Sequence, residues 1–534
     1  MRLRFADFAG EIPRRHPRLL PQSYAQVARN TRLDDGAITT FRVATQAHNF
    51  GMTIRRVVRF GGQWVGWSSA DVAAVPGPIA DNRLYITGEG QPKMRVGSTT
   101  YNLALPGPTQ RPTIALIGDP DDDPEEERVV YAYTFRTEFF EESAPSPLSL
   151  PRTWRSGQIV RVSSFATGAL NRGISHIRIY RSQTSALGTT DLYFVREVAL
   201  GTGQFDHDIE TDPLQEVIQT TDYDTPVAGL QGVIAMPNGM MAAFAGREVF
   251  FSEPYRPHAW PRKYALTVDH PVVGLVAFGP VLAILTQSTP YIAQGNSPEV
   301  MIMEKMEQNL PCLARHGIVD LGYAAAYPSH EGLVLISATG AQVVSRTLFT
   351  REQWRIMQPA TFRAAQHDGR YLVSYQPIGA GTRKTGLIDL SGEQPFFIEA
   401  TGDAISWYAE PGTGTLFYIP SPGTAGTVMQ WDAPGAAPQK QRWRGRLNVL
   451  PMLTNFGAAL VDAEQAPANK PAGEPDATVR VFADGALVRQ FTTLNQPVRL
   501  PSGFAATQWE VEVEGYAPIT GISIATSIDQ LAEP

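Results

Sequence analysis

The chain has 534 residues, of which 43% are hydrophobic and 18% charged, with 47 Gly and 42 Pro. A chain of this length is too long to fold around one hydrophobic core, so we expect several domains. The composition excludes a disordered chain, and the many Gly and Pro residues indicate domains rich in strands and turns. The formal net charge of -7 argues against a protein that grips nucleic acid with its whole surface. The single cysteine, Cys312, excludes an intrachain disulfide and a Cys-based zinc site, which fits a reducing cytoplasm. We interpret Cys312 as a small buried residue.

Residues 1–36 are predicted to form an extended basic arm and a short helix over residues 21–30, ended by Asp34-Asp35-Gly36. From Met1 to Arg59 there are eleven Arg and four acids, a formal charge of +7 that leaves -14 for the rest. The arm is either a solvated basic tail or a strap that docks onto an acidic neighbour. The residues expected to dock are Arg2, Arg4, Arg14, Arg15 and Arg18. No apolar run of signal-peptide length follows Arg18.

Residues 37–111 alternate in strand fashion and are predicted to form a first propeller blade or platform. The expected strands are 53–60, 64–67 and 83–87. The segment 118–127 then carries seven acids and no base. A calcium loop is one interpretation, but the spacing is not that of an EF-hand, so a solvated acidic loop is favoured.

Residues 112–225 are predicted to form a compact antiparallel sandwich inserted into the propeller. Its expected strands are 128–135, 158–162, 174–181 and 192–198. The loop Glu141–Pro147, with its Ser-Ala-Pro-Ser-Pro run, is typical of fibronectin type III-like modules.

Residues 226–440 repeat a unit of strand, glycine turn and strand, and the spacing predicts the remaining propeller blades. The turn glycines are Gly239, Gly279, Gly332, Gly369 and Gly414, spaced by about 44 residues on average. Stacked hairpins in a sandwich are the alternative, although sandwiches space their turns more closely. The apolar run 272–285 is too short for a membrane span and is broken at Gly279-Pro280, so we expect two buried strands and no membrane insertion. Thr350 and Gln353 predict a capping box at the start of one helix.

Within this region, residues 246–261 combine a buried strand, Val249–Phe251, with a loop stiffened by Pro254, Pro257 and Pro261. The loop carries three aromatic side chains, namely Tyr255, His258 and Trp260. They are predicted to form an interface with a neighbouring subunit or, alternatively, to pack on their own blade.

Residues 441–534 are predicted to form a C-terminal β-sandwich with one apolar and one charged face. The expected fold is therefore mostly β: a β-propeller core with an inserted fibronectin type III/Ig-like sandwich and a C-terminal β-sandwich.

No catalytic, cofactor or metal site is predicted. The sequence lacks a Walker loop, a helix with paired His ligands and Gly-x-Ser-x-Gly. Asp206-His207-Asp208 is the densest cluster, but neighbours on one extended segment point to opposite faces. Of the nine His, His48, His258, His270, His316, His330 and His367 are expected in turns or strand ends, half-exposed. We therefore expect a building block of an assembly and no enzyme.

The segment Phe251–Pro261 resembles the nozzle proteins of short-tailed bacteriophages, also called tail tubular protein B. Further matching places, in the same order along nearly the whole chain, are residues 20–30, 64–67, 83–88, 133–147 and 499–504. The resemblance implies a virion tail protein, assembled in the host cytoplasm, that forms a homohexameric ring below the head-to-tail adaptor. Such rings continue the DNA channel, close its lower end and give tail fibres a place to attach.

An acidic or neutral bore would let DNA slide without sequence-specific binding, which agrees with the charge of -14 outside the first 59 residues. The main alternative is a propeller that binds or cleaves polysaccharide, and it predicts convergent carboxylates beside exposed aromatic side chains in one cleft. A receptor-binding tail component that binds glycan is a further alternative.

Overall fold

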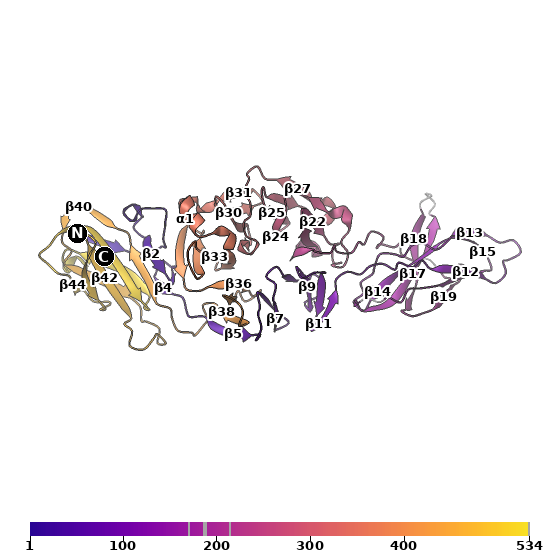
Figure 1. Cartoon of the computed structure of the whole chain (residues 1–534), viewed down its shortest axis with the longest axis horizontal. Coiled ribbons are helices and arrows are strands. Elements are labelled where there is room, and N and C mark those ends of the chain that lie inside the picture. The colour runs from indigo at the N-terminus through magenta and orange to yellow at the C-terminus, as the bar shows by residue number, and fades with distance from the viewer. Residues whose placement is uncertain (169–170, 185–189, 213–214, 393, 532–534) are drawn as a thin grey trace. The chain divides into compact units, whose positions relative to one another are not determined.

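The computed structural model describes residues 1–168, 171–184, 190–212, 215–392 and 394–531 (Figure 1). The fold is mostly β, with a β-propeller core, an inserted sandwich and a C-terminal sandwich, as the sequence predicts. The chain divides into two compact units: unit 1 is residues 1–70, 281–292 and 304–534, and unit 2 is residues 71–280 and 293–303.

Helical structure among the described residues is limited to one α-helix and short 3-10 turns. The α-helix is α1 (Arg351–Ile356), and the turns are η1 (Pro17–Leu19), η2 (Pro237–Gly239), η3 (Arg262–Tyr264), η4 (Pro298–Val300), η5 (Arg315–Gly317), η6 (Val344–Thr347), η7 (Pro359–Thr361) and η8 (Asp529–Leu531). The predicted capping box at α1 is confirmed, because Thr350 Oγ1 accepts from Gln353 N–H and Gln353 Oε1 accepts from Thr350 N–H. None of these helices is long and apolar enough to cross a membrane.

Unit 2 contains two four-stranded antiparallel blades. The first is β8 (Ala73–Pro76), β9 (Arg83–Thr87), β10 (Lys93–Val96) and β11 (Thr99–Asn102), and the second is β20 (Gln231–Ala235), β21 (Met241–Ala245), β22 (Glu248–Phe251) and β23 (Leu266–Thr267). Tyr85, Met94, Val233, Phe250 and Trp260 belong to the hydrophobic cluster between them. The predicted strand Val249–Phe251 is confirmed as part of β22.

The inserted sandwich also lies in unit 2 and is built from β12 to β19. Its sheets are β12 (Thr113–Ile117), β16 (Ile159–Ser163) and β19 (Gln204–His207); β13 (Glu126–Val129) and β15 (Arg152–Arg155); and β14 (Tyr131–Thr137), β17 (Ile174–Thr184) and β18 (Thr190–Ala199). Alternating residues such as Tyr131, Tyr133, Val160 and Ile177 are buried in its core. The acidic loop before β13 is exposed at Asp121, Asp122 and Asp123, as a solvated loop requires.

Unit 1 contains further blades of the propeller. They are β28 (Val319–Asp320), β29 (Ala325–Ser329), β30 (Gly332–Ser337) and β31 (Gly340–Val343); β36 (Ala404–Ala409), β37 (Leu416–Pro420), β38 (Thr427–Gln430) and β5 (Thr45–Asn49); and the hairpin β6 (Arg56–Phe60) and β7 (Gln63–Trp67). Two short strands, β3 (Thr31–Arg32) and β4 (Thr39–Thr40), pair with each other. The chain also forms β24 (Val272–Phe278), β25 (Val281–Thr286), β26 (Tyr291–Gln294) and β27 (Ile302–Lys305), so the expected two strands around Gly279-Pro280 are confirmed.

The prediction that residues 37–111 form a single blade is wrong. Strand β5 pairs with β38, so it completes a blade whose other strands come from residues 404–430. The next hairpin, β6–β7, is a separate sheet, and only residues 73–102 form a four-stranded blade. Local alternation predicted the strands correctly, but it carries no information about which strands pair.

The predicted helix over residues 21–30 is also wrong, because these residues contain β2 (Ala25–Arg29). This strand pairs antiparallel with β39 (Gln441–Gly445) and, through Arg29 and Glu399, parallel with β35 (Phe396–Ala400). The resulting sheet has ten strands: β32 (Arg363–His367), β33 (Arg370–Tyr375), β34 (Lys384–Asp389), β35, β2, β39, β45 (Ala506–Gly515), β42 (Ala477–Ala483) and β43 (Ala486–Phe491), with β40 (Asn448–Thr454) also on β45. Tertiary pairing that buries Ala25 and Ala28 overrides the helical propensity of Ala and Gln.

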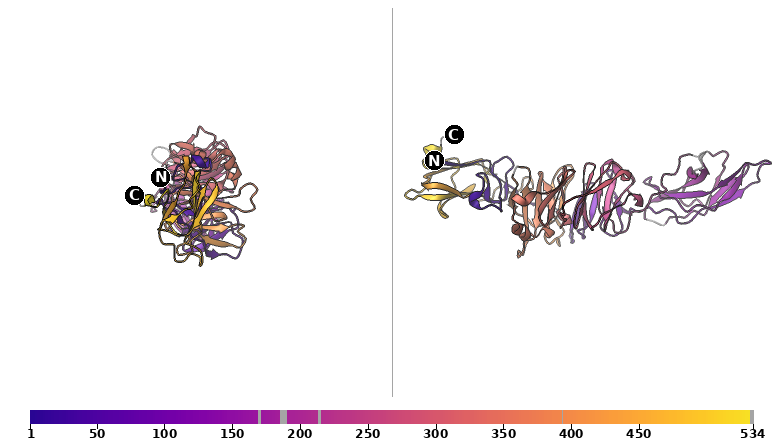
Figure 2. Two further views of the ribbon diagram at one scale, coloured as in Figure 1. Left: turned by 90° about the vertical axis from the view of Figure 1, so that its left-hand side faces the viewer. Right: turned by 90° about the horizontal axis from the view of Figure 1, so that it is seen from above.

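The N-terminal segment is part of the body and is no free arm. Strand β1 (Arg2–Phe5) is the edge of a sheet with β46 (Ile519–Ala525), β41 (Ala458–Ala463) and β44 (Val498–Arg499). The C-terminal sandwich therefore needs β1 and β2 in addition to residues 441–534. Phe5, Phe8, Trp443, Trp509 and Ile522 lie in its core. The N-terminus lies in this part (Figure 2), where the Met1 ammonium donates to Gln530 Oε1 at 2.8 Å.

The outer face of the second sandwich sheet is charged, as predicted. Arg442, Glu512 and Arg480 come from the neighbouring strands β39, β45 and β42. Their ion pairs join Arg442 to Glu512 at 2.8 Å and Arg480 to Glu512 at 2.7 Å.

Candidate functional site

The arginines expected to dock onto a neighbour lie in two places on unit 1. Arg2 and Arg4 belong to β1, where Arg2 Nη2 donates to Ser523 Oγ at 3.2 Å. Arg14, Arg15 and Arg18 lie in and before η1 and are exposed. The five side chains therefore do not converge on one point.

The segment that carries Arg14 is fixed to the body of unit 1. Ile12 and Leu20 are buried in the same cluster as Trp354. Arg14 N–H donates to Leu348 O at 2.9 Å, and Gln353 Nε2 donates to Pro13 O at 2.8 Å. The arginines of this segment are therefore presented on a rigid support.

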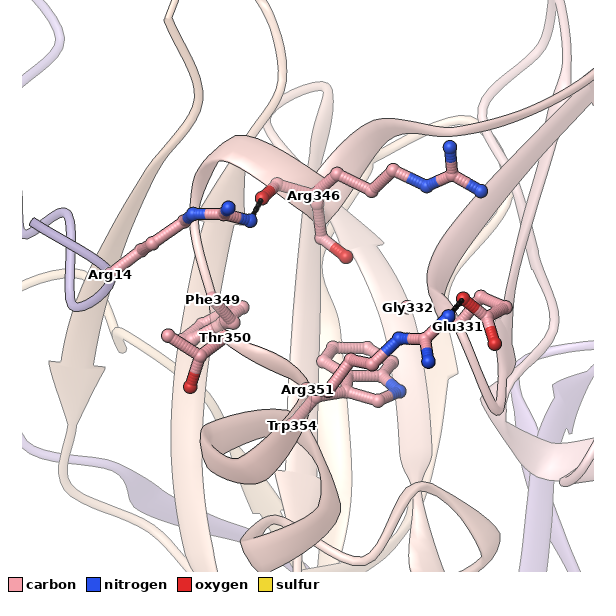
Figure 3. Close-up of a pocket in the computed structure, with 9 residues that line it drawn as sticks. Arg14, Glu331, Gly332, Arg346, Phe349, Thr350, Arg351 and Trp354 are labelled. Carbon is pink, nitrogen blue, oxygen red and sulfur yellow. Dashed lines mark hydrogen bonds and ion pairs between the residues drawn. The ribbon is translucent and has the colours of Figure 1, made fainter.

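Arg14 borders a cavity of about 310 Å³, and Figure 3 shows its lining. The lining residues are Arg14, Glu331, Gly332, Ser345, Arg346, Phe349, Thr350, Arg351 and Trp354. They come from the N-terminal segment, the start of β30, η6 and the start of α1. We call this cavity the arginine pocket.

Three guanidinium groups and one carboxylate border the arginine pocket. Arg351 Nη2 lies 2.6 Å from Glu331 Oε2, while Arg14 Nη1 donates to the main-chain oxygen of Arg346 at 2.5 Å (Figure 3). Within the described part of the chain, the Arg346 guanidinium has no hydrogen bond or ion pair. The pocket thus carries two positive charges that no carboxylate in it offsets.

The pocket has a rigid aromatic wall. Phe349 and Trp354 are buried with ring centroids 5.9 Å apart, and Trp354 Nε1 donates to Ser329 O at 2.8 Å. Gly332 allows Ser345 to approach the start of β30 closely: it has a φ of +141°, and a Cβ there would lie 2.5 Å from Ser345 Oγ. Any side chain at this position would be strained and would crowd Ser345.

The aromatic loop 255–260 in unit 2 is mostly internal. Trp260 is 1% exposed and His258 is 2% exposed, whereas Tyr255 is 53% exposed. Trp260 Nε1 donates to Pro257 O at 2.7 Å, and His258 Nε2 lies 2.9 Å from Glu142 O. Burial lowers the pKa of His258 to about 3, so its ring is neutral at physiological pH.

This placement corrects the expected interface role of His258 and Trp260, and the expectation that His258 is half-exposed. Both side chains are buried inside unit 2, but not on their own blade alone: Trp260 belongs to the cluster between the two blades, and His258 contacts Glu142 O of the inserted sandwich. Only Tyr255 remains available to a partner.

The cluster Asp206-His207-Asp208 does not converge, as predicted. Asp206 pairs with Arg161 across β19 and β16 at 2.7 Å. His207 points inward, where its Nδ1 lies 2.7 Å from Tyr131 Oη, and burial lowers its pKa to about 4. Asp208 Oδ1 accepts from Glu210 N–H at 3.1 Å, which stabilises a turn.

Cys312 is buried, as expected, and burial raises the pKa of its thiol to about 12. Over the described ranges, the structure places no three metal-binding side chains together.

Sequence reasoning identified Arg14 but missed Arg346, Arg351 and Glu331. These residues lie more than 300 positions further along the chain, and no motif spacing links them to Arg14. The capping box at Thr350 was the one local signal near them, and it indicated a helix start without indicating a pocket.

No family model and no curated protein matches the chain. Solved structures similar to it include BBS1N in complex with ARL6DN, at 10% identity and a TM-score of 0.29, over 74% of this chain and 99% of that one. The β-propeller domain of Swd1 (Cps50) from Myceliophteria thermophila matches at 10% identity and a TM-score of 0.22, over 48% and 93%. PorZ, a surface component of the type-IX secretion system of Porphyromonas gingivalis, matches at 10% identity and a TM-score of 0.28, over 89% and 77%. TM-scores this low support no inference about function.

Proposed function

We propose that the chain is a structural protein of a short-tailed bacteriophage tail, the nozzle that forms a homohexameric ring below the head-to-tail adaptor. In this role it continues and gates the channel for DNA ejection and docks tail fibres. The observation that carries the proposal is the resemblance of Phe251–Pro261, and of five further segments in matching order, to nozzle proteins.

The anchored N-terminal segment supports the proposal that the chain docks onto the adaptor. An interface loses less conformational entropy when its charged side chains are held on a rigid support. Arg14, Arg15 and Arg18 meet this condition, because Ile12 and Leu20 bury the segment on either side of them. We therefore assign adaptor docking to these three, with Arg2 and Arg4 on the neighbouring β1 as further contacts.

Charge reversal tests this assignment better than truncation. Deleting residues 1–18 would remove Phe5, Phe8 and Ile12 from two hydrophobic clusters and unfold unit 1. A triple variant, Arg14→Glu, Arg15→Glu and Arg18→Glu, changes exposed side chains only.

The experiment combines native mass spectrometry of the chain with a co-sedimentation assay on adaptor rings. The proposal expects six copies per particle on the adaptor, and loss of co-sedimentation for the triple variant. The matched control reverses the exposed Arg489 and Arg499 and should co-sediment normally. A chain that stays monomeric on adaptor rings, or is absent from purified virions, contradicts the nozzle function.

A second candidate function is saccharide binding, favoured by one polar cavity of about 260 Å³ in unit 2. Glu142 and Glu216 line it beside Phe140, a residue that is 76% exposed. Arg178 holds both carboxylates, with Nη1 2.6 Å from Glu142 Oε2 and Nη2 2.7 Å from Glu216 Oε1. Because both carboxylates are held as ion pairs, this cavity suits binding better than acid–base cleavage.

Glycan-array binding by the purified chain tests this candidate. Binding that disappears in a Phe140→Ala variant supports a receptor-binding tail component. An array on which the purified chain binds no glycan contradicts the saccharide-binding function.

A further inference from the structure

The arginine pocket has an imbalance of charge that its own residues do not correct. Glu331 offsets Arg351, while Arg14 donates to a main-chain oxygen and Arg346 has no partner among the residues described. Arg14, Arg346 and Arg351 are exposed, whereas Phe349 and Trp354 form a buried wall of the pocket. A bound anion would offset the excess positive charge.

The chemistry of the pocket favours a carboxylate. A planar guanidinium can donate two parallel hydrogen bonds to a carboxylate, and Arg351 already pairs with one carboxylate here, through a single contact of 2.6 Å to Glu331. The volume of about 310 Å³ suits one or two acidic side chains.

We propose that the arginine pocket is a docking site for an acidic polypeptide segment of a partner protein. The inference rests on the proposed function, since it names the chemistry by which unit 1 would recognise the adaptor. It adds Arg346 and Arg351 to the docking surface and gives Arg14 a specific role at the pocket rim.

Nucleic acid is the less suitable occupant. Binding a phosphate backbone requires a track of basic residues that follows the strand, whereas these three arginines surround one compact cavity.

The N-terminal segment makes the pocket complete. Arg14 reaches it because Arg14 N–H donates to Leu348 O at 2.9 Å and Pro13 O accepts from Gln353 at 2.8 Å. Ligand binding should therefore protect Arg14 and Arg346 together, although they lie 332 positions apart in the sequence.

The test uses the full-length chain alone, with hexaglutamate peptide as the probe. Phenylglyoxal modifies exposed arginines, and peptide mapping by mass spectrometry measures the rate at each one. The expected result is that hexaglutamate slows modification of Arg14 and Arg346 severalfold and leaves the exposed Arg499 unchanged. Equal protection of all three arginines would overturn the proposal.

Calorimetry on variants gives the second readout. Arg346→Glu should weaken hexaglutamate binding about tenfold or more, as expected for the loss of one charge-assisted hydrogen-bonded pair. Arg346→Lys keeps the positive charge but loses the planar guanidinium that can donate two parallel hydrogen bonds. It should therefore weaken hexaglutamate binding by less than Arg346→Glu does. Arg499→Glu makes the same charge change outside the pocket and should change the affinity less than twofold. Equal weakening by Arg346→Glu and Arg499→Glu would mean that only net charge matters.

Tripolyphosphate and a short DNA duplex serve as competing probes. If either protects Arg14 and Arg346 better than hexaglutamate, the pocket is a phosphate site and the proposal is wrong. No adaptor is present, so failure here is distinct from failure of the nozzle function. If hexaglutamate binds the pocket but an Arg346→Glu ring joins the adaptor normally, the pocket serves another acidic partner.

Discussion

The side chain of Glu11 accepts a hydrogen bond from the main-chain N–H of Ala28, with Oε1 and N 2.7 Å apart. This contact holds the N-terminal segment against β2, where Ala28 is fully buried. Burial raises the pKa of the Glu11 carboxyl from 4.5 to about 8, since the charged form loses its hydration.

The Glu11 carboxyl makes the stability of unit 1 depend on pH. The folded state keeps its proton up to pH of about 8, whereas the unfolded chain loses it near pH 4.5. Folding therefore takes up a proton between these two pH values. The stability associated with the protonated Glu11 carboxyl is fully present below pH 4.5 and is lost as pH rises toward 8. A Glu11→Gln variant keeps the acceptor oxygen and carries no charge, so it should be more stable than wild type at pH 8 and similar at pH 4.5.

Hydrogen exchange measured on peptides covering residues 8–30 at the two pH values, with rates corrected for intrinsic exchange, checks this prediction. A Glu352→Gln variant, which changes an exposed carboxyl in the same unit, should show the wild-type pH dependence. A Glu11→Gln variant that loses protection with rising pH as wild type does would contradict the assignment.

Glu512 on the charged sheet should show the opposite dependence on pH. Burial acts to raise its pKa, but hydrogen bonds from Arg442 and Arg480 outweigh burial and lower it below 4.5. The stability that these pairs contribute is present above the unfolded-state pKa and is lost as pH falls through the folded one.

A Glu512→Gln variant should lower the free energy of unfolding by about 2 kcal/mol at pH 7, because Arg442 loses its carboxylate partner and Arg480 keeps only Glu514. Below pH 4 the difference should shrink. Urea unfolding followed by tryptophan fluorescence at both pH values measures it, and an equal difference at both would exclude the ionic explanation.

The parts of the fold that local patterns encode were predictable from the sequence. Strands such as β9 and β22 follow from alternating or apolar runs between glycine and proline, and the capping box of α1 follows from two residues three positions apart. The helix expected over residues 21–30 failed because the partner of β2 is β39, more than 400 residues away. Local sequence propensity carries no information about pairing between strands so far apart in the sequence.

The candidate site could be predicted only in part for the same reason. The density of arginine near the N-terminus indicated Arg14, but Arg346 and Arg351 meet it only through the packing of residues 12–20 on η6 and α1. His258 was misplaced because its proline-rich surroundings indicate a loop without indicating that the loop is buried. Its ring lies inside unit 2, with Nε2 2.9 Å from Glu142 O.

Substitutions at Trp260 and Tyr255 should separate packing from interface roles in the aromatic loop. Trp260→Ala should destabilise unit 2 by about 3–5 kcal/mol, because it removes a buried indole and its hydrogen bond to Pro257. Tyr255→Ala removes an exposed ring and should change stability by less than about 0.5 kcal/mol.

Urea unfolding of both variants, with their assembly state determined by native mass spectrometry, checks this prediction. Tyr255→Ala is expected to alter assembly without altering stability if the loop contacts a neighbouring subunit. A stable Trp260→Ala variant would contradict the packing that the structure shows.

Ser146 offers a last test, in the loop that replaces a strand beside β14. Ser146 N–H donates to Tyr133 O at 2.8 Å, and Tyr133 N–H donates to Ser146 Oγ at 3.1 Å. Ser143 and Ser149 make the same exchange with Phe135 and Tyr131. Because prolines interrupt this segment, the serine hydroxyls accept the main-chain N–H groups that a regular strand would satisfy.

A Ser146→Ala variant leaves the buried N–H of Tyr133 without its acceptor and should cost about 1–3 kcal/mol. Hydrogen exchange of peptides covering β14 should accelerate, whereas a Ser98→Ala variant at an exposed position of unit 2 should leave it unchanged. Unchanged exchange in Ser146→Ala would mean that water satisfies the Tyr133 amide, and that the serine spacing of this loop has another cause.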